Sequence, residues 1–493
     1  MPTVTRLIAN TYRDSVALMQ LSVQLRDLPG VEEASMIMAT EGNLALLREV
    51  GLLAGAVAAR PSDLLVVVRA KTQAAAEAAI ARGEDALRAA KPAAAGTGPG
   101  IIAPRSIDMA LADAPASNLA LISVPGEYAA AEAAKALARG LNVMLFSDNV
   151  SLEDEVALKR RALERGLLLM GPDCGTAIID GVPLGFANRV RRGPIGCVAA
   201  SGTGLQQVTT LVDRLGLGVS QAIGTGGRDL NDAVGGVTML AGLKLLAADR
   251  DTRVVVLISK PPAPGVAARV IAEAAQARKP VVINFIGADT AVRGKNLHVA
   301  RTLEDAARAA VALAQGCKPP KGPAAARLGA LPRLAKSQRY VRGLFSGGTF
   351  CYEAKRILGA ALGESWQACG HRLVDLGDDV YTRGRPHPMI DHRLRNERIV
   401  REASDPEVAV ILLDVVLGYG AHPDPAGEMT PALRAARKAN RRVAFVGSVC
   451  GTDADPQGLA RQEAALREAG VILGASNAAA ARIAAKIVAG RRP

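Results

Sequence analysis

Aromatic residues and paired cysteines are scarce in this sequence. Aromatics make up only 3% of its 493 residues, whereas 49% are hydrophobic, so the cores must consist mainly of Ala, Val, Leu and Ile. That composition suits parallel α/β layers, whose inner strands are continuous aliphatic runs. The six cysteines are scattered and form no Cys-x-x-Cys pair. We therefore expect neither a disulfide framework nor a metal site.

Long apolar runs are missing as well. No run reaches the roughly 18 residues that cross a bilayer, and the first ten residues, MPTVTRLIAN, lack the apolar segment of a signal peptide. We expect a soluble, cytoplasmic protein with no membrane partner. The net charge of +13 could mark a nucleic-acid binder, but the basic residues form no stripe interleaved with aromatics. We expect no nucleic-acid partner, and a positive surface that favours anionic substrates or acidic partner subunits.

The order of apolar runs predicts an α/β protein of several domains. The first part mixes short strands and helices, which predicts a ferredoxin-like α+β unit. Strands and helices then alternate strictly from residue 118, which predicts parallel sheets with right-handed crossovers. Two segments rich in Ala, Pro and Gly predict linkers. The predicted boundaries are 1–88 for the ferredoxin-like domain, 89–117 for a linker, 118–190 and 191–316 for two α/β domains, 317–338 for a second linker and 339–493 for the last domain.

A repeat indicates that two of these domains are copies of one flavodoxin-like fold. The segment IGCVAASGTGLQQV (195–208) has a counterpart in VRGLFSGGTFCYEA (341–354). Both have a strand, then Ser-Gly and Thr, and then helical spacing of apolar residues. VVVLISKPP and AVILLDVVLG follow the two segments in the same order, as do PVVINFIG and RVAFVGSVCG. Duplication is the economical explanation.

Glycine turns follow four strands of the predicted sheets, and three of them also contain Ser, Thr or Arg. Ligands bind at the carboxyl ends of parallel strands, and a helix start offers unpaired N–H groups and the positive end of the helix dipole. Ordinary capping and tight turns explain any one such segment, but four at corresponding positions indicate phosphate or substrate sites. The candidate residues are Ser201, Gly202, Thr203, Gly204, Gly226, Gly227, Arg228, Ser346, Gly347, Gly348, Thr349, Gly418 and Gly420.

A loop dense in charge supplies the candidate catalytic residues. It reads DLGDDVYTRGRPHPMID (375–391), and its candidates are Asp379, Arg385 and His387. Polar density in a long loop often marks a site, although a solvated loop explains it equally well. Cys174, in GPDCGT, could be a nucleophile, but it has no histidine nearby in the sequence, which favours a small residue that fills a turn.

Several segments together resemble the FdrA family, relatives of succinyl-CoA synthetase. They are MGPDCGTAI, ASGTG, GTGGRDL, SKPPA, DLGDDVYTRGRPHPMID and LLDVVLGYG. The resemblance implies that 118–190 is a partial Rossmann-like domain of the CoA-binding type. It also implies that 191–316 and 339–493 are ligase domains, similar to the synthetase α subunit and to the end of its β subunit. The helices that start after Ser201 and after Gly418–Gly420 would then face each other and hold a phosphoryl group.

This sequence departs from the synthetase pattern in three places. It has no ATP-grasp part, so this chain alone should not use ATP. The half that carries the synthetase's CoA-binding glycine loop is missing or replaced, so neither CoA nor any other cofactor is assigned. The strand end that carries a histidine-orienting glutamate in the synthetase reads ISKPP here. Lys260 is therefore a candidate anion-binding residue, and His298, near the place of the phosphohistidine, does not match that motif.

The resemblance to FdrA members linked to allantoin breakdown implies an oxamate carbamoyltransferase subunit in purine catabolism. Oxalurate and phosphate would give oxamate and carbamoyl phosphate, in a homo-oligomer with two further subunits. Arg228 or Lys260 would pair with the carboxylate of the small anionic substrate. The 378–391 loop, with Asp379, Arg385 and His387, would polarise its carbonyl or move a proton. Two alternatives stay open: a subunit of an ADP-forming acyl-CoA synthetase and a non-catalytic scaffold.

Overall fold

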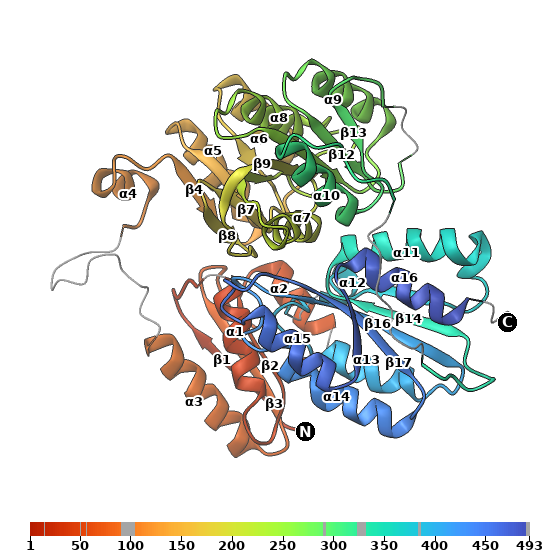
Figure 1. Cartoon of the computed structure of the whole chain (residues 1–493). Coiled ribbons are helices and arrows are strands. Elements are labelled where there is room, and N and C mark those ends of the chain that lie inside the picture. Colours follow the sequence, from red (N-terminus) through yellow and green to blue (C-terminus); the bar gives the residue numbers. More distant parts are fainter. Residues whose placement is uncertain are drawn as a thin grey trace. The chain divides into compact units, whose positions relative to one another are not determined.

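Figure 1 shows the computed structural model of the chain. The chain comprises two compact units. Unit 1 comprises Met1–Val143, Ser147–Val150 and Asp379–Pro386, and unit 2 the remainder. None of the described helices combines the length and hydropathy that a membrane crossing requires. The described residues are 1–13, 15–49, 51–55, 57–89, 104–288, 292–322, 332–382 and 386–489.

Unit 1 begins with an antiparallel sheet of order β1-β3-β2, as expected for an α+β domain. The central strand β3 reads LLVVVRA and is almost wholly buried, because its alternating side chains face two separate cores. One core packs Val66 and Val68 with the helices α1 and α3, and the other packs Leu65 and Val67 with α2. The bounds are β1 (Thr3–Ile8), α1 (Ser15–Arg26), β2 (Val31–Met38), α2 (Glu41–Glu49), β3 (Leu64–Ala70) and α3 (Gln73–Ala89).

The predicted linker 89–117 contains a helix in its described part, α4 (Ile107–Asp113). Ser106 starts this helix, because its hydroxyl accepts a hydrogen bond from the amide of Met109 at 3.2 Å. The chain continues with β4 (Leu119–Ile122), α5 (Gly126–Ala138) and β5 (Asn142–Leu145), and β4 is a neighbour of β5 in one small sheet. Unit 1 also includes α12 (Asp379–Thr382).

Unit 2 contains a first module (residues 176–314) built on a sheet of order β13-β12-β11-β9-β10-β7-β8. Its strands from β13 to β10 are parallel, and the antiparallel hairpin β7–β8 extends the β10 edge. This hairpin belongs to residues predicted for the preceding domain, so the boundary predicted at 190 does not separate the sheets. The bounds are α6 (Leu152–Glu164), β6 (Leu169–Met170), β7 (Thr176–Ile179), β8 (Val182–Gly185), β9 (Arg192–Ala199), α7 (Gly202–Arg214), β10 (Val219–Gly224), α8 (Val237–Ala248), β11 (Val254–Ser259), α9 (Pro264–Gln276), β12 (Val281–Phe285), β13 (Leu297–Val299) and α10 (Leu303–Ala314).

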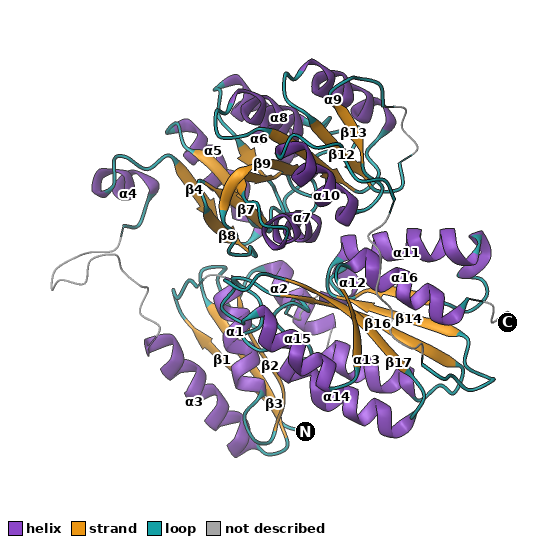
Figure 2. Cartoon of the chain, viewed as in Figure 1, coloured by secondary structure: helices purple, strands orange, loops and turns teal. Residues whose placement is uncertain are grey.

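The second module (residues 340–488) has a fully parallel sheet of order β15-β14-β16-β17-β18. Figure 2 shows its strands in orange and its helices in purple. The bounds are β14 (Tyr340–Phe345), α11 (Gly348–Leu362), the 3₁₀ turn η1 (Glu364–Trp366), β15 (Arg372–Asp375), α13 (Arg393–Ala403), β16 (Val408–Val416), α14 (Pro425–Ala439), β17 (Ala444–Cys450), α15 (Leu459–Glu468), β18 (Val471–Gly474) and α16 (Asn477–Val488).

The two modules share one topology, which confirms the predicted duplication. When only the five parallel strands of each module are numbered, both modules have the flavodoxin-like order 2-1-3-4-5. In such a sheet, ligands bind outside the carboxyl ends of strands 1 and 3, where the strand order reverses. These strands are β9 and β11 in the first module and β14 and β16 in the second. We therefore expect the ligand-binding residues to follow these four strands.

A buried carboxylate lies where helices of the two modules meet. Glu353 on α11 accepts hydrogen bonds from the amide of Leu303 (2.7 Å) and from the Nδ2 of Asn477 (2.8 Å). Glu304 and Arg482 form an ion pair beside it, at 2.8 Å. Burial raises the pKa of Glu353 from 4.5 to about 7.

We expect Glu353 to make unit 2 less stable as the pH rises from about 4.5 to about 7. In that range the folded chain holds the proton more tightly than the unfolded chain, so raising the pH weakens folding. The variant Glu353→Gln should lose this part of the pH dependence. Urea unfolding followed by the fluorescence of the single tryptophan, Trp366 in unit 2, measures it.

The exposed Glu468 on α15 offers a matched control. Glu468→Gln should keep the pH dependence of the wild-type chain. If the free energy of unfolding changed equally with pH in wild type and in Glu353→Gln, the role of Glu353 would be contradicted.

Candidate functional site

The start of α7 has the geometry of a capped helix with open donors. Ser201 follows β9, and its Oγ accepts a hydrogen bond from the amide of Gly204 at 2.9 Å. A Cβ on Gly204 would lie 3.1 Å from a methyl group of Ile258 in β11, so glycine lets the cap close against the sheet. The amides of Gly202 and Thr203 have no acceptor within the helix. These two donors, at the positive end of the helix dipole, are suited to an anion.

The start of α11 is already occupied by an anion of the chain itself. Asp414, inside β16, accepts hydrogen bonds from the amides of Ser346 (2.8 Å) and Gly347 (2.7 Å) and from the Ser346 hydroxyl (3.0 Å). The buried guanidinium of Arg395 lies 3.1 Å from the same carboxylate. Ser346 and Gly347 were predicted to bind an external phosphate, but their donors already hold this carboxylate. Of that predicted site, Gly348 and Thr349 remain.

The starts of α7 and α11 touch each other. The hydroxyls of Ser201 and Thr349 are hydrogen-bonded at 2.6 Å. A Cβ on Gly347 would lie 3.0 Å from the Thr203 methyl group and 2.8 Å from the Phe350 ring, so only glycine fits this approach. The structure thus brings together residues from two of the four predicted anion sites.

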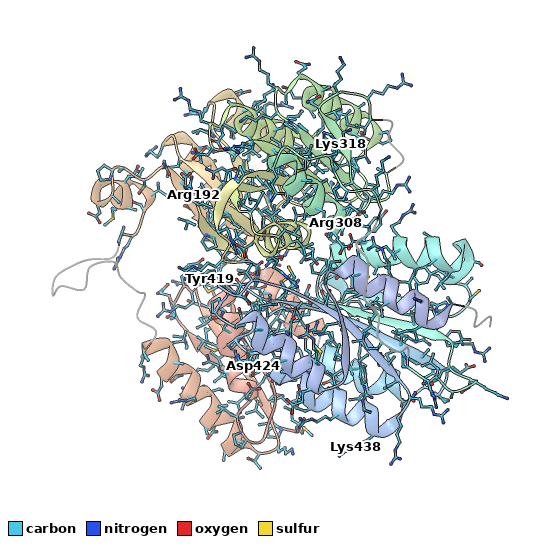
Figure 3. All side chains as sticks on the ribbon, viewed as in Figure 1. Arg192, Arg308, Lys318, Tyr419, Asp424 and Lys438 are labelled. Carbon is cyan, nitrogen blue, oxygen red and sulfur yellow. The ribbon has the colours of Figure 1, made fainter. Side chains whose placement is uncertain are left out.

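The segment Gly418–Gly420, which the resemblance placed opposite Ser201, makes different contacts. The Gly418 amide donates to Oε1 of Gln457 (3.0 Å), and the Tyr419 amide donates to the carbonyl of Ala187 (2.9 Å). Figure 3 labels Tyr419 and Asp424, and Asp424 caps the start of α14. The two amides therefore hold this loop in place, and the partner of the α7 start in the structure is α11.

Lys260 and Asp375 lie beside the start of α11. A Cβ on Gly348 would collide with Oδ2 of Asp375 and would lie 3.6 Å from Nζ of Lys260. Oδ1 of Asp375 accepts a hydrogen bond from the Gly377 amide at 2.9 Å. Burial raises the pKa of Asp375, while the Gly377 hydrogen bond and the charge of Lys260 act in the opposite direction. Lys260 is one of the predicted anion-binding residues. Asp375 was not predicted as a site residue, although an acidic residue at the end of a parallel strand is a feature that the sequence shows.

His387 reaches the same place as a neutral hydrogen-bond donor. Its Nδ1 accepts the amide proton of Met389 at 3.2 Å, so the neutral ring carries its proton on Nε2. Burial lowers the pKa of His387 to about 4. A Cβ on Gly377 would lie 2.8 Å from Nε2, which places this nitrogen next to the loop that holds Asp375. At neutral pH the geometry suits a donor to a carbonyl oxygen rather than a base.

Neither of the other two predicted catalytic residues is a described residue of unit 2. Asp379 begins α12, which belongs to unit 1. Arg385 lies outside the described residues. Of the three, only His387 is part of the described site.

The predicted site at Gly226, Gly227 and Arg228 is tied to a buried ion-pair network. Nε of Arg228 lies 2.9 Å from a carboxylate oxygen of Glu155 on α6. Lys159, also on α6, contacts Glu155 at 3.1 Å and Asp229 at 2.6 Å, and all three side chains are buried. Arg228 thus has a protein anion beside it, and this network fixes the loop after β10 against α6.

Cys174 is buried within the fold, and His298 lies in a strand. Burial raises the pKa of the Cys174 thiol to about 12, so this sulfur is not a thiolate at neutral pH. His298 lies in β13, the outer strand of its sheet, where it pairs with Val282 of β12. Among the described residues, no group of three His, Cys, Asp or Glu side chains could hold a metal ion.

Arg395 and Asp414 form the buried pair on which the α11 start depends. Asp414→Asn should lower the free energy of unfolding of unit 2 by about 3–5 kcal/mol, because it leaves the Arg395 charge buried without a counter-ion. Urea unfolding followed by Trp366 fluorescence measures the change. Adding Arg395→Met to Asp414→Asn should restore part of the loss; no difference between single and double variants would contradict this explanation.

Three family models match parts of the chain. The model described as CoA-ligase matches residues 344–487, the CoA binding domain model matches 191–287, and the model described as AllF, heavy metal-associated domain, matches 1–100. Together with the duplicated flavodoxin-like modules, they show an α/β protein with CoA-binding and CoA-ligase domains.

Several known proteins are similar to this chain. Protein YahF of Escherichia coli K12, described as uncharacterized, is 43% identical over 95% of both chains. Subunit alpha 2 of the ADP-forming succinate–CoA ligase of Archaeoglobus fulgidus is 30% identical over 37% of this chain and 62% of that one. The solved structure of a dinucleotide-forming acetyl-coenzyme A synthetase from Ca. Korarchaeum cryptofilum shares 16% identity, with a TM-score of 0.33, over 76% of this chain and 83% of that one. The chain belongs to the FdrA-like family that includes YahF.

The ligands that these model names imply can be compared with the residues present. Residues 1–100 contain neither cysteine nor histidine, so the soft ligands typical of heavy metals are missing there. The match to the CoA binding domain model, 191–287, includes the turn Ser201–Gly204 between strand β9 and helix α7, a place where glycines let the backbone approach a pyrophosphate. We assign no step to a metal.

Proposed function

We propose that this chain is a subunit of an oxamate carbamoyltransferase, which transfers the carbamoyl group of oxalurate to phosphate. The proposed assembly is a homo-oligomer with two further subunits, and its products are oxamate and carbamoyl phosphate. The proposal is supported by the cluster of Gly202, Thr203, Lys260 and His387 at the two helix starts. This cluster combines hydrogen-bond donors for an anion with a group able to act on a carbonyl.

The observation that carries the proposal is Lys260 at the end of β11, beside the start of α11. A relay through phosphohistidine needs a nucleophilic imidazole near the phosphate. His387 donates from Nε2, and His298 lies on the outer strand β13. A lysine at this place instead favours holding phosphate while phosphate itself attacks the carbonyl carbon.

Each group of the cluster has a part in this reaction. The amides of Gly202 and Thr203 and the ammonium of Lys260 would bind the phosphate oxygens. A phosphate oxygen attacks the carbamoyl carbon, and negative charge develops on the carbonyl oxygen. The Nε2–H of His387 would donate to that oxygen, an interaction that strengthens as the charge forms. Thr349 and Ser201 hold the two helix starts at a fixed separation.

The direct test is product formation by the chain together with its partner subunits. Oxalurate and inorganic phosphate should give carbamoyl phosphate, detected by ³¹P NMR, without ATP. Lys260→Met should raise the KM for phosphate about 10-fold to 100-fold, because a hydrogen bond to a charged group is lost.

Lys438 on α14, labelled in Figure 3, is an exposed lysine of the same module and serves as the control. Lys438→Met should leave the KM for phosphate unchanged. Equal effects of the two substitutions would remove Lys260 from the site.

A subunit of an ADP-forming acyl-CoA synthetase is the second candidate, favoured by the 30% identity to the succinate–CoA ligase subunit. With an ATP-grasp partner, it predicts ADP release that depends on both CoA and a carboxylic acid. It also predicts phosphate on His298, detectable by mass spectrometry at neutral or alkaline pH. Product formation without ATP, and with no phosphate on His298, favours the carbamoyltransferase.

The third reading, a non-catalytic scaffold, makes a separate prediction. It predicts no measurable binding of inorganic phosphate to the isolated chain by calorimetry.

A further inference from the structure

Asp375 differs from the other carboxylate near the two helix starts. Asp414 is fully buried, and its two oxygens receive three hydrogen bonds from Ser346 and Gly347 and contact Arg395. Asp375 is only half-buried, and the one hydrogen bond described for it goes from the Gly377 amide to Oδ1. Asp414 therefore stabilises the fold, whereas Asp375 has an oxygen available for another role.

Two glycines keep space around the Asp375 carboxylate. At Gly348 a Cβ would collide with Oδ2 of Asp375; at Gly377 it would lie 3.3 Å from Oδ1 and 2.8 Å from Nε2 of His387. Neither glycine has the left-handed φ that would by itself require glycine. The space is what these glycines provide, and it lets Asp375, Lys260 and His387 converge beside the α11 start.

The surroundings of Asp375 suit a carboxyl group that gains and loses a proton. Burial and the charges of Asp414 and Asp378 favour the protonated form, while Lys260 and the Gly377 amide favour the carboxylate. The Cys351 thiol on α11 also lies within electrostatic range, and burial keeps it protonated at neutral pH. A group balanced in this way can accept a proton and return it within one turnover.

We propose that Asp375 is the proton carrier of this site. The proposal rests on the proposed function, attack of phosphate on a carbamoyl group bound to an amide nitrogen. Hydrogen phosphate forms the new C–O bond, and its proton passes to Asp375. The C–N bond then breaks, and Asp375 gives the proton to the departing nitrogen. No other acid or base is consumed, and both products leave with their normal complement of protons.

The experiment compares wild type with Asp375→Asn and Asp375→Ala in the complex with its partner subunits. Both variants should lower kcat about 10²-fold to 10⁴-fold, the usual range for a general acid–base. The acid limb of the kcat/KM profile should also disappear. Formate should restore part of the activity of Asp375→Ala, since a small carboxylate can occupy the vacated space. Glu468→Gln, at an exposed acidic residue of α15, should behave as wild type.

Binding of inorganic phosphate to each isolated chain, measured by calorimetry, checks that the site survives the substitutions. Both Asp375 variants should bind phosphate at least as tightly as wild type, because a negative charge near Lys260 is removed. Loss of both phosphate binding and turnover, with no rescue by formate, would assign Asp375 a structural role and overturn the proposal.

The outcomes separate this proposal from the proposed function. A wild-type complex that forms carbamoyl phosphate, with Asp375→Asn equal to it in kcat and pH profile, overturns the role of Asp375 alone. A wild-type complex that forms no carbamoyl phosphate overturns the proposed function and the proton carrier with it.

Discussion

The hydrogen bond between Ser201 and Thr349 joins the starts of two helices from duplicated modules, and the site depends on this contact. Two helix starts repel each other, because both carry the positive end of a helix dipole. The buried carboxylate of Asp414 counters that charge at α11. The start of α7 keeps its open amides, so the pair is asymmetric: one start is neutralised internally and the other can accept an external anion.

Much of the fold could be predicted because its signals are local. A strand followed by Ser-Gly, Thr and a helix recurs in both modules, and the shared strand order confirms the duplication. The helix α4 was missed inside a segment read as a linker, since only Ser106 marks its start. The hairpin β7–β8 precedes the boundary predicted at 190 but joins the sheet that contains β9 and β10, because sequence order does not reveal which sheet a short strand joins.

The site was predicted less completely because its partners are distant in sequence. Asp414 lies 68 residues from Ser346, within an apolar strand, so nothing local shows that it fills the α11 start. Arg228, in the loop after β10, was assigned to a substrate, but its partner Glu155 lies on α6. Lys260 departs from the family pattern at a strand end and could be found from the sequence. Asp375 occupies a comparable strand end and was overlooked in favour of the charged residues that follow it.

A crystal structure of the chain grown with inorganic phosphate tests the central claim most directly. The account predicts phosphate density within hydrogen-bond distance of the Gly202 and Thr203 amides and of the Lys260 ammonium. Density at the Gly418–Gly420 loop instead, or an empty α7 start at a phosphate concentration that saturates binding in solution, would contradict it.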